Sequence, residues 1–144
     1  MDHKMNMLAV AVATLMPMIV GFIYYHPKVA GGMWMKANGF TLDSIGNGPK
    51  PILYVGALVL AFFLALFCHG NVTGPDQWTA EDGHSYVTFA HGLLHGFGNT
   101  IMVVLPILGT MAVFEKRSWQ WLAVNCVYWL ITLALMCGIL SAWR

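Results

Sequence analysis

Four long apolar runs dominate the sequence, and none of them has an Asp, Glu, Lys or Arg in its interior. They extend from Met5 to Tyr25, from Ile52 to Cys68, from Tyr86 to Phe114 and from Trp119 to Trp143. Each approaches or exceeds the ~20 residues that an α-helix needs to cross a hydrocarbon core of about 30 Å. Because only a helix satisfies its own backbone hydrogen bonds in lipid, the pattern predicts four transmembrane helices.

The chain as a whole is too poor in charge to present a water-facing surface. Charged residues make up 9% of its 144 positions, whereas an ordinary soluble domain has roughly 25%. The formal net charge of +1 provides no basic face, so nucleic acid is excluded as a partner and the lipid bilayer is expected in its place. Because the length suits one compact unit, we expect a single all-α, four-helix transmembrane bundle over residues 1–144.

The Lys and Arg residues predict the orientation of the bundle. Five of them fall in the first and third connections: Lys28, Lys36, Lys50, Lys116 and Arg117. The second connection has Asp and Glu but no Lys or Arg, and it shares its side with Lys4 and Arg144 near the chain ends. Because basic residues are enriched on the cytoplasmic side of membrane proteins, we expect the first and third connections in the cytoplasm and both termini outside.

The first connection, residues 28–51, contains a segment suited to the membrane surface. Trp34 and Lys36 lie in it, and both residue types prefer the depth of the lipid headgroups. Thr41 is placed to cap a brief helical turn before a glycine-rich stretch. We therefore expect an interfacial segment between the first and second helices. Further interfacial anchors are expected at the ends of the apolar runs: Tyr24, Tyr25, Lys116, Arg117, Trp119 and Trp143.

One polar stripe interrupts the third apolar run. Thr88, His91, His95 and Asn99 are spaced three, four and four residues apart, which places them on one face of a helix. Polar groups within a membrane segment usually face the bundle interior or a watery cavity. The stripe is therefore the candidate functional site, as the lining of a small channel or of a carrier coupled to protons.

The histidines near this stripe leave two other interpretations open. His69 follows the second run and His84 precedes the third, so up to four imidazoles are expected near the outer surface, together with His91 and His95. Two histidines at i and i+4 can bind one ion, which makes a metal or haem site an alternative. In the structural interpretation, the neutral imidazoles only hydrogen-bond to neighbouring helices. The sequence has no soluble-enzyme motif, so no catalytic residue and no required cofactor are predicted.

Small and polar residues predict where the helices pack. Gly92 and Gly96 form a GxxxG pair that permits close helix approach, either within the chain or between subunits. Asn125 and Tyr128 lie on a polar line of the fourth run, which is expected to pair with the third helix or the first. The leading hypothesis is a non-catalytic membrane protein that acts by association, as a homo-oligomer or as an accessory subunit of a membrane complex. A carrier, a channel and a metal or haem protein are the alternatives.

Two regions of the chain resemble the bacterial domain of unknown function 1761 family. The first is Tyr24-Tyr25-His26-Pro27 with Gly32, Trp34-Met35 and Gly39, and the second is Phe114-Glu115-Lys116-Arg117 with Asn125, Tyr128, Met136, Gly138-Ile139-Leu140 and Trp143. Trp129 departs from the pattern, which has histidine beside the tyrosine. The resemblance implies a small protein with four helices in the bacterial cytoplasmic membrane, and it implies no reaction. In a bacterium, the glycosylation pattern at Asn71-Val72-Thr73 has no consequence.

Overall fold

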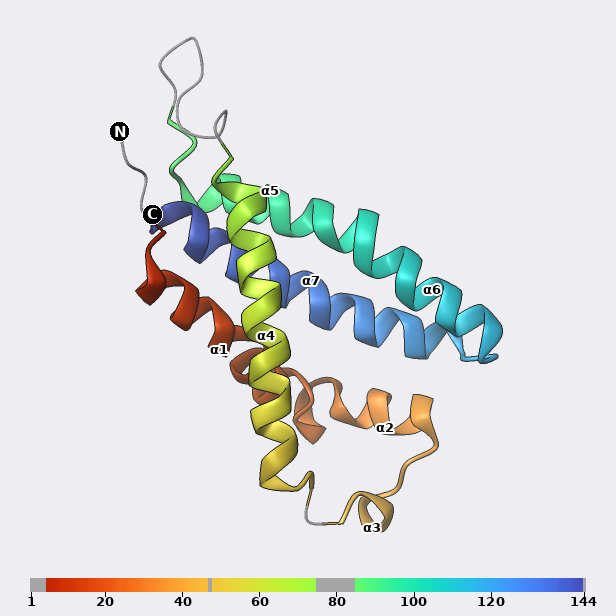
Figure 1. The fold of residues 1–144 in the computed structure, drawn as a ribbon. Coiled ribbons are helices and arrows are strands. Elements are labelled where there is room, and N and C mark those ends of the chain that lie inside the picture. The colour runs from red at the N-terminus through yellow and green to blue at the C-terminus, as the bar shows by residue number, and fades with distance from the viewer. Residues whose placement is uncertain (1–4, 47, 75–84, 144) are drawn as a thin grey trace.

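Helices make up nearly all of the chain that the computed structural model describes, which is residues 5–46, 48–74 and 85–143 (Figure 1). In chain order the elements are α1 (Met7–Tyr24), η1 (Pro27–Gly31), α2 (Gly32–Asn38), α3 (Leu42–Ile45), α4 (Pro51–Val72), α5 (Phe89–Asn99), η3 (Thr100–Val104), α6 (Leu105–Phe114) and α7 (Trp119–Ala142). The elements η1 and η3 are π-helical turns. Because η3 joins α5 directly to α6, these three elements form one helical span.

Within the described residues, four helices are long and apolar enough to cross a membrane: α1, α4, the α5–η3–α6 span and α7. The expected all-α architecture is thereby confirmed. Helix α4 continues past its expected end at Cys68, so His69 and Asn71 belong to its last turns. The third span begins only at Phe89, because Thr88 is extended and caps the helix.

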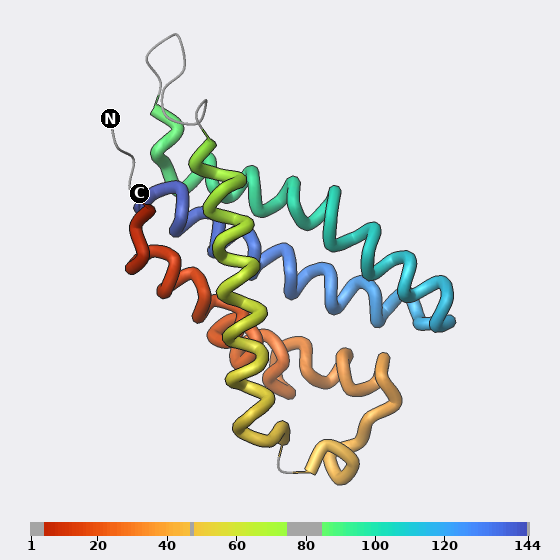
Figure 2. Tube along the Cα trace, in the orientation of Figure 1, coloured from red at the N-terminus to blue at the C-terminus, as the bar shows by residue number. Residues whose placement is uncertain are grey.

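Consecutive long helices run in opposite directions, so α1 begins and α7 ends at the same end of the bundle (Figure 2). Helix α7 packs against α1, α4, α5 and α6, and it is the most buried of the four long helices. Its side chains form the core together with those of α1 and α4, including Val10, Ala13, Ala65, Leu133 and Met136. Helix α4 packs mainly on α1 and α7, and only its last turns approach α5.

The five basic residues expected to share one side lie at the end of the bundle opposite to the start of α1. Lys28 is in η1, Lys36 is in α2 and Lys50 directly precedes α4. Lys116 and Arg117 form the turn between α6 and α7. The fold thus separates a basic end from the end where α4 finishes and α5 begins (Figure 1).

The connection between α1 and α4 is folded into short helices. Thr41 caps α3 through a capping box with Ser44, as its position predicted. Helix α2 packs against α7, and Trp121 Nε1 donates a hydrogen bond to Asn38 Oδ1 at 3.2 Å. These contacts attach the connection to the basic end of the bundle.

The third span widens into the π-helical turn η3 just before Pro106. A proline inside an α-helix has no N–H to donate, and its ring collides with the carbonyl group four residues earlier. In η3 the Leu105 N–H donates to the carbonyl of Thr100, five residues back. The wider turn accommodates the proline, and it starts directly after Asn99, the last residue of the polar stripe.

Gly92 and Gly96 are buried against the backbone of α7 in the same chain. A Cβ atom at Gly92 would collide with the carbonyl oxygen of Cys137, and one at Gly96 would collide with the backbone of Ala134. The missing side chains therefore allow α5 and α7 to approach closely. The GxxxG pair serves a contact within the chain, so it supplies no argument for a contact between copies.

Candidate functional site

The polar stripe on α5 meets an asparagine in the last turn of α4. Asn71 Oδ1 accepts hydrogen bonds from His95 Nδ1 at 2.9 Å and from Asn99 Nδ2 at 3.3 Å. Because an amide oxygen only accepts, Nδ1 is a protonated nitrogen of the His95 ring, and Nε2 is the accepting nitrogen when the ring is neutral. Asn99 Nδ2 also lies 3.8 Å from Cys137 Sγ, which extends the network to α7.

A pocket of about 400 Å³ opens beside this network. We call it the polar pocket, and its lining residues are Asn71, His91, Leu94, His95, Gly98, Asn99 and Met102. Leu94 is 71% exposed and Met102 is 76% exposed, so the mouth of the pocket lies on the outer surface of the third span. No Asp, Glu, Lys or Arg is among these lining residues. The volume falls within the range of about 300–1,000 Å³ that is usual for small-molecule sites.

The first two residues of the stripe have different roles. Thr88 is the N-cap of α5, where its Oγ1 accepts a hydrogen bond from the His91 N–H at 3.2 Å. The centroid of the His91 ring lies 4.5 Å from that of His95 and 4.9 Å from that of Tyr86. Thr88 therefore starts the helix outside the pocket lining, whereas His91 and His95 line the pocket side by side.

The histidines expected to gather at this end are only partly brought together. His91 and His95 are adjacent, whereas His69 Nδ1 lies 3.2 Å from Thr73 Oγ1, one turn further along the chain. His84 lies outside the described residues. In the part of the chain that the structure describes, no three His, Cys, Asp or Glu side chains are grouped as metal ligands. The described geometry offers an imidazole pair, whereas a typical zinc site has at least three protein ligands.

Asn71 is the site residue that reasoning from the sequence missed. In the sequence, Asn71 stands out only as the first residue of a glycosylation pattern beyond the end of the second apolar run. In the structure, α4 continues through Asn71, and the Asn71 side chain accepts hydrogen bonds from His95 and Asn99. The sequence did contain a signal for this role. Asn71 lies just after the second apolar run, and the last turn of one helix lies beside the first turns of its antiparallel neighbour.

A second polar cluster joins α1 to α7 at the basic end. Tyr24 Oη donates to the carbonyl of Val124 at 3.0 Å, and Tyr25 Oη donates to Asn125 Oδ1 at 3.1 Å. Burial raises the pKa of the Tyr25 phenol, and two neighbouring tyrosines raise it further. The tyrosines at the end of α1 thus make specific contacts with α7, beyond the interfacial position that the sequence predicted for them.

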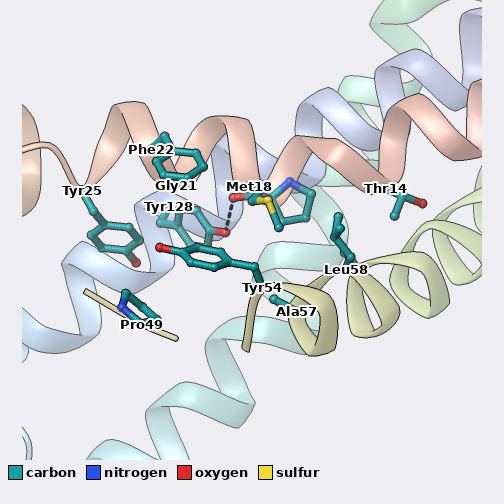
Figure 3. A pocket seen from close by; sticks show the side chains of 12 residues that line it. Thr14, Met18, Gly21, Phe22, Tyr25, Pro49, Tyr54, Ala57, Leu58 and Tyr128 are labelled. Carbon is teal, nitrogen blue, oxygen red and sulfur yellow. Dashed lines mark hydrogen bonds between the residues drawn. The ribbon is translucent and has the colours of Figure 1, made fainter. Parts of the chain in front are cut away.

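A pocket of about 380 Å³ lies between α1, α4 and α7 beside these tyrosines (Figure 3). We call it the tyrosine pocket, and its lining includes Thr14, Met18, Phe22, Tyr25, Tyr54, Ala57, Leu58, Ala61 and Tyr128. The Tyr54 and Phe22 rings are stacked, with centroids 6.2 Å apart. Tyr128 Oη donates to the carbonyl of Pro17 at 2.8 Å, as the dashed line in Figure 3 shows. The hydroxyls of Tyr25 and Tyr128 are engaged in hydrogen bonds that join helices. The rest of the pocket wall is mostly apolar.

The tryptophans expected at the interface fall into two groups. Trp119 is 85% exposed and Trp143 is 42% exposed, at the two ends of α7. Trp34 is instead packed among other rings, with its centroid 5.5 Å from that of Tyr25. Trp34 therefore stabilises the attachment of α2, while the other two rings are exposed at the ends of α7.

Comparison with known proteins places the whole bundle within one family. The family model described as "Protein of unknown function (DUF1761)" matches residues 8–141, which include all four long helices except Met7 at the start of α1 and Ala142 at the end of α7. No curated protein and no solved structure gives a significant match. The match agrees with the resemblance found in the sequence, and its description names no activity.

Proposed function

We propose that this chain, which belongs to the DUF1761 family, spans a membrane four times and binds a small uncharged solute in its polar pocket. It acts as a carrier and performs no catalysis. The observation on which this function rests is the polar pocket itself, where amide and imidazole groups line an open space beside helices that are otherwise apolar.

The four long apolar helices support insertion into a membrane, since their lengths and hydropathy suit a hydrocarbon core. The basic end favours an orientation with the α6–α7 turn in the cytoplasm and both termini outside. The family resemblance favours the cytoplasmic membrane of a bacterium. In this orientation the polar pocket lies in the outer half of the membrane.

The exposure of the polar side chains distinguishes a site that binds a solute from contacts that only join helices. Side chains that only join helices are enclosed by the contact that they make. Asn99 is enclosed in this way, whereas Asn71, His91 and His95 are only partly buried and border the pocket. Polar groups that line a cavity inside membrane segments commonly mark the path of a solute.

The chemistry of the lining favours an uncharged solute. The lining residues include no Asp, Glu, Lys or Arg, so an ion would enter without a counter-charge, which is costly in a membrane. Asn71, His91, His95 and Asn99 provide hydrogen-bond donors and acceptors. Leu94 and Met102 supply an apolar flank. A small polyol or amide fits this combination.

The core between the two pockets favours a carrier over an open channel. Along α4 and α7, the core residues Ala65, Cys68, Leu133 and Met136 follow the tyrosine-pocket residues Ala61 and Tyr128, and all four are buried with at most 2% exposure. A solute in the polar pocket cannot pass these residues unless the helices move. Exposure of one binding site to the two sides of a membrane in turn is the behaviour of a carrier.

Cysteine labelling tests whether the polar pocket is wet and binds a solute. Gly98 lines the pocket, and a Cβ atom there meets open space, so Gly98→Cys is sterically allowed. Gly56 in α4 also has open space and lies outside the pocket lining, so Gly56→Cys is the matched control. Both variants are made with Cys126→Ser, because the remaining thiols of Cys68 and Cys137 are buried.

We expect a membrane-impermeant thiosulfonate to modify Gly98→Cys in membrane vesicles and to leave Gly56→Cys unmodified. Acetamide, urea and glycerol are the probes for binding, and at least one of them is expected to slow the modification of Gly98→Cys. Equal labelling of both cysteines, or no labelling of either, contradicts a water-filled pocket. Labelling that none of the three probes slows contradicts the solute class proposed.

Association with a second copy or another subunit stays a separate proposal. It needs a surface other than the Gly92 and Gly96 seam, since α7 already covers that seam. Mass measurement of the particle in mild detergent tests it, and a strictly monomeric particle with no co-purifying protein contradicts it.

A further inference from the structure

A third hollow, of about 600 Å³, lies between α6 and α7 at the basic end. Its apolar wall includes Gly109 and Ala112 of α6 and Leu122 of α7, and its end is closed by Lys116, Arg117 and Trp119. We call this hollow the basic groove. It combines a hydrocarbon-like wall with cationic groups at a single end.

The groove exists because the third span packs differently along its length. Its first half, α5, is drawn against α7 by Gly92 and Gly96. Its second half, α6, packs on α7 much less extensively. Gly109 adds to the open space, since no side chain and no neighbouring helix lies within 4 Å of the position that its Cβ would occupy.

The charge at the end of the groove is positive. The turn also contains one carboxylate, Glu115, which pairs with Arg117 at 2.9 Å. Arg117 also lies over the Trp121 ring, 5.5 Å from its centroid, which fixes the position of the guanidinium. Lys116 has a φ of 53°, in the left-handed region where glycine is the usual residue. The turn therefore has a lysine where its backbone conformation favours glycine.

We propose that the basic groove binds one anionic phospholipid, with its phosphate at Lys116 and Arg117 and an acyl chain along α6. Leu105 and Val113 of α6 both line the groove and are eight residues apart, which corresponds to roughly 12 Å along the helix axis. This length accommodates most of an acyl chain. Basic pockets between membrane helices recognise such headgroups. Trp119 is 85% exposed beside the turn, at the depth where headgroups meet hydrocarbon. This inference rests on the membrane-spanning part of the proposed function and is independent of the solute.

Native mass spectrometry in mild detergent provides the test, with phosphatidylglycerol and phosphatidylcholine of identical acyl chains as probes. We expect the wild type to retain one phosphatidylglycerol about fivefold more often than phosphatidylcholine, the preference for one net positive charge, since Glu115 pairs with Arg117. Lys116→Gly, which suits the backbone there, is expected to remove this preference. Lys50→Gln removes a basic residue at the same end outside the groove and is expected to keep it.

A second pair of variants tests the acyl-chain part of the site. Gly109→Leu fills the groove and is expected to abolish retention of both lipids, whereas Gly56→Leu, on open surface of α4, is expected to bind as the wild type does. Equal retention of the two lipids by the wild type, or unchanged retention by Gly109→Leu, overturns the inference. If Gly98→Cys is still labelled selectively in that case, only the lipid site falls and the proposed solute site stands.

Discussion

His95 Nδ1 lies 2.9 Å from Asn71 Oδ1, so an imidazole of α5 and an amide of α4 are joined across a separation of 24 residues. The contact fixes which nitrogen of His95 carries a proton and directs the accepting nitrogen away from Asn71. It also holds the last turn of α4 beside the third span, which otherwise packs mainly on α7. Together with the hydrogen bond from Asn99 Nδ2 to the same oxygen, this contact sets the shape and the chemistry of the polar pocket.

Replacement of Asn71 by Leu is expected to lower the free energy of unfolding by about 1–3 kcal/mol. The change leaves the donors of His95 and Asn99 without their common acceptor, and unsatisfied donors in a bundle carry this cost. Asn71→Asp keeps an acceptor at the same place and is the control. Unfolding by sodium dodecyl sulfate in mixed micelles, followed by tryptophan fluorescence, measures the difference. Wild-type stability for Asn71→Leu would show that the network contributes nothing.

Replacement of Gly96 by Ala is expected to destabilise the bundle by about 1–3 kcal/mol, because the new methyl group collides with the backbone of Ala134. Gly98→Ala, half a turn away, is the matched control. Its methyl group meets open space, and alanine favours a helix over glycine by up to about 1 kcal/mol. In the same unfolding measurement, we expect Gly96→Ala to be less stable than the wild type and Gly98→Ala to be more stable. Equal effects would contradict the close contact between α5 and α7.

Removal of the Tyr128 hydroxyl, by Tyr128→Phe, is expected to cost about 0.5–1.5 kcal/mol of stability. The hydroxyl donates to the carbonyl of Pro17, which joins the middle of α7 to α1. Tyr54→Phe alters another tyrosine of the same pocket that is 36% exposed, and a smaller effect is expected there. Thermal unfolding of the purified proteins compares them. A larger loss for Tyr54→Phe would refute the assignment of Tyr128 as the tie between the helices.

Stability is expected to decline above about pH 10 in a way that depends partly on Tyr25. Burial raises the pKa of the folded phenol above its ordinary value near 10, so the unfolded chain loses this proton first. The stabilisation is complete below pH 10 and is lost as the pH rises towards the raised pKa. Unfolding measured from pH 8 to pH 11.5 is expected to show a shallower decline for Tyr25→Phe than for the wild type. Parallel declines would contradict the burial of this hydroxyl.

The sequence by itself determined the elements of the fold. The length and apolarity of the four runs predicted helices, because a helix is the single segment that satisfies its own backbone hydrogen bonds in hydrocarbon. Local signals placed several helix ends, such as Thr41 at the start of α3, since capping involves residues only three positions apart. Because consecutive helices run in opposite directions, the first and third connections, which carry five basic residues, also fall at the same end of the bundle.

Only the tertiary structure decided which residues meet. The helices are apolar on nearly every face, so their hydropathy carries little information on which face turns inward. Gly92 and Gly96 were recognisable as a seam, but the choice of α7 as their partner depended on rotations about both helix axes. Asn71 acquired its role because α4 continued past the apolar run and turned its amide towards His95. Such contacts are set by packing between segments distant in the chain, which no local pattern specifies.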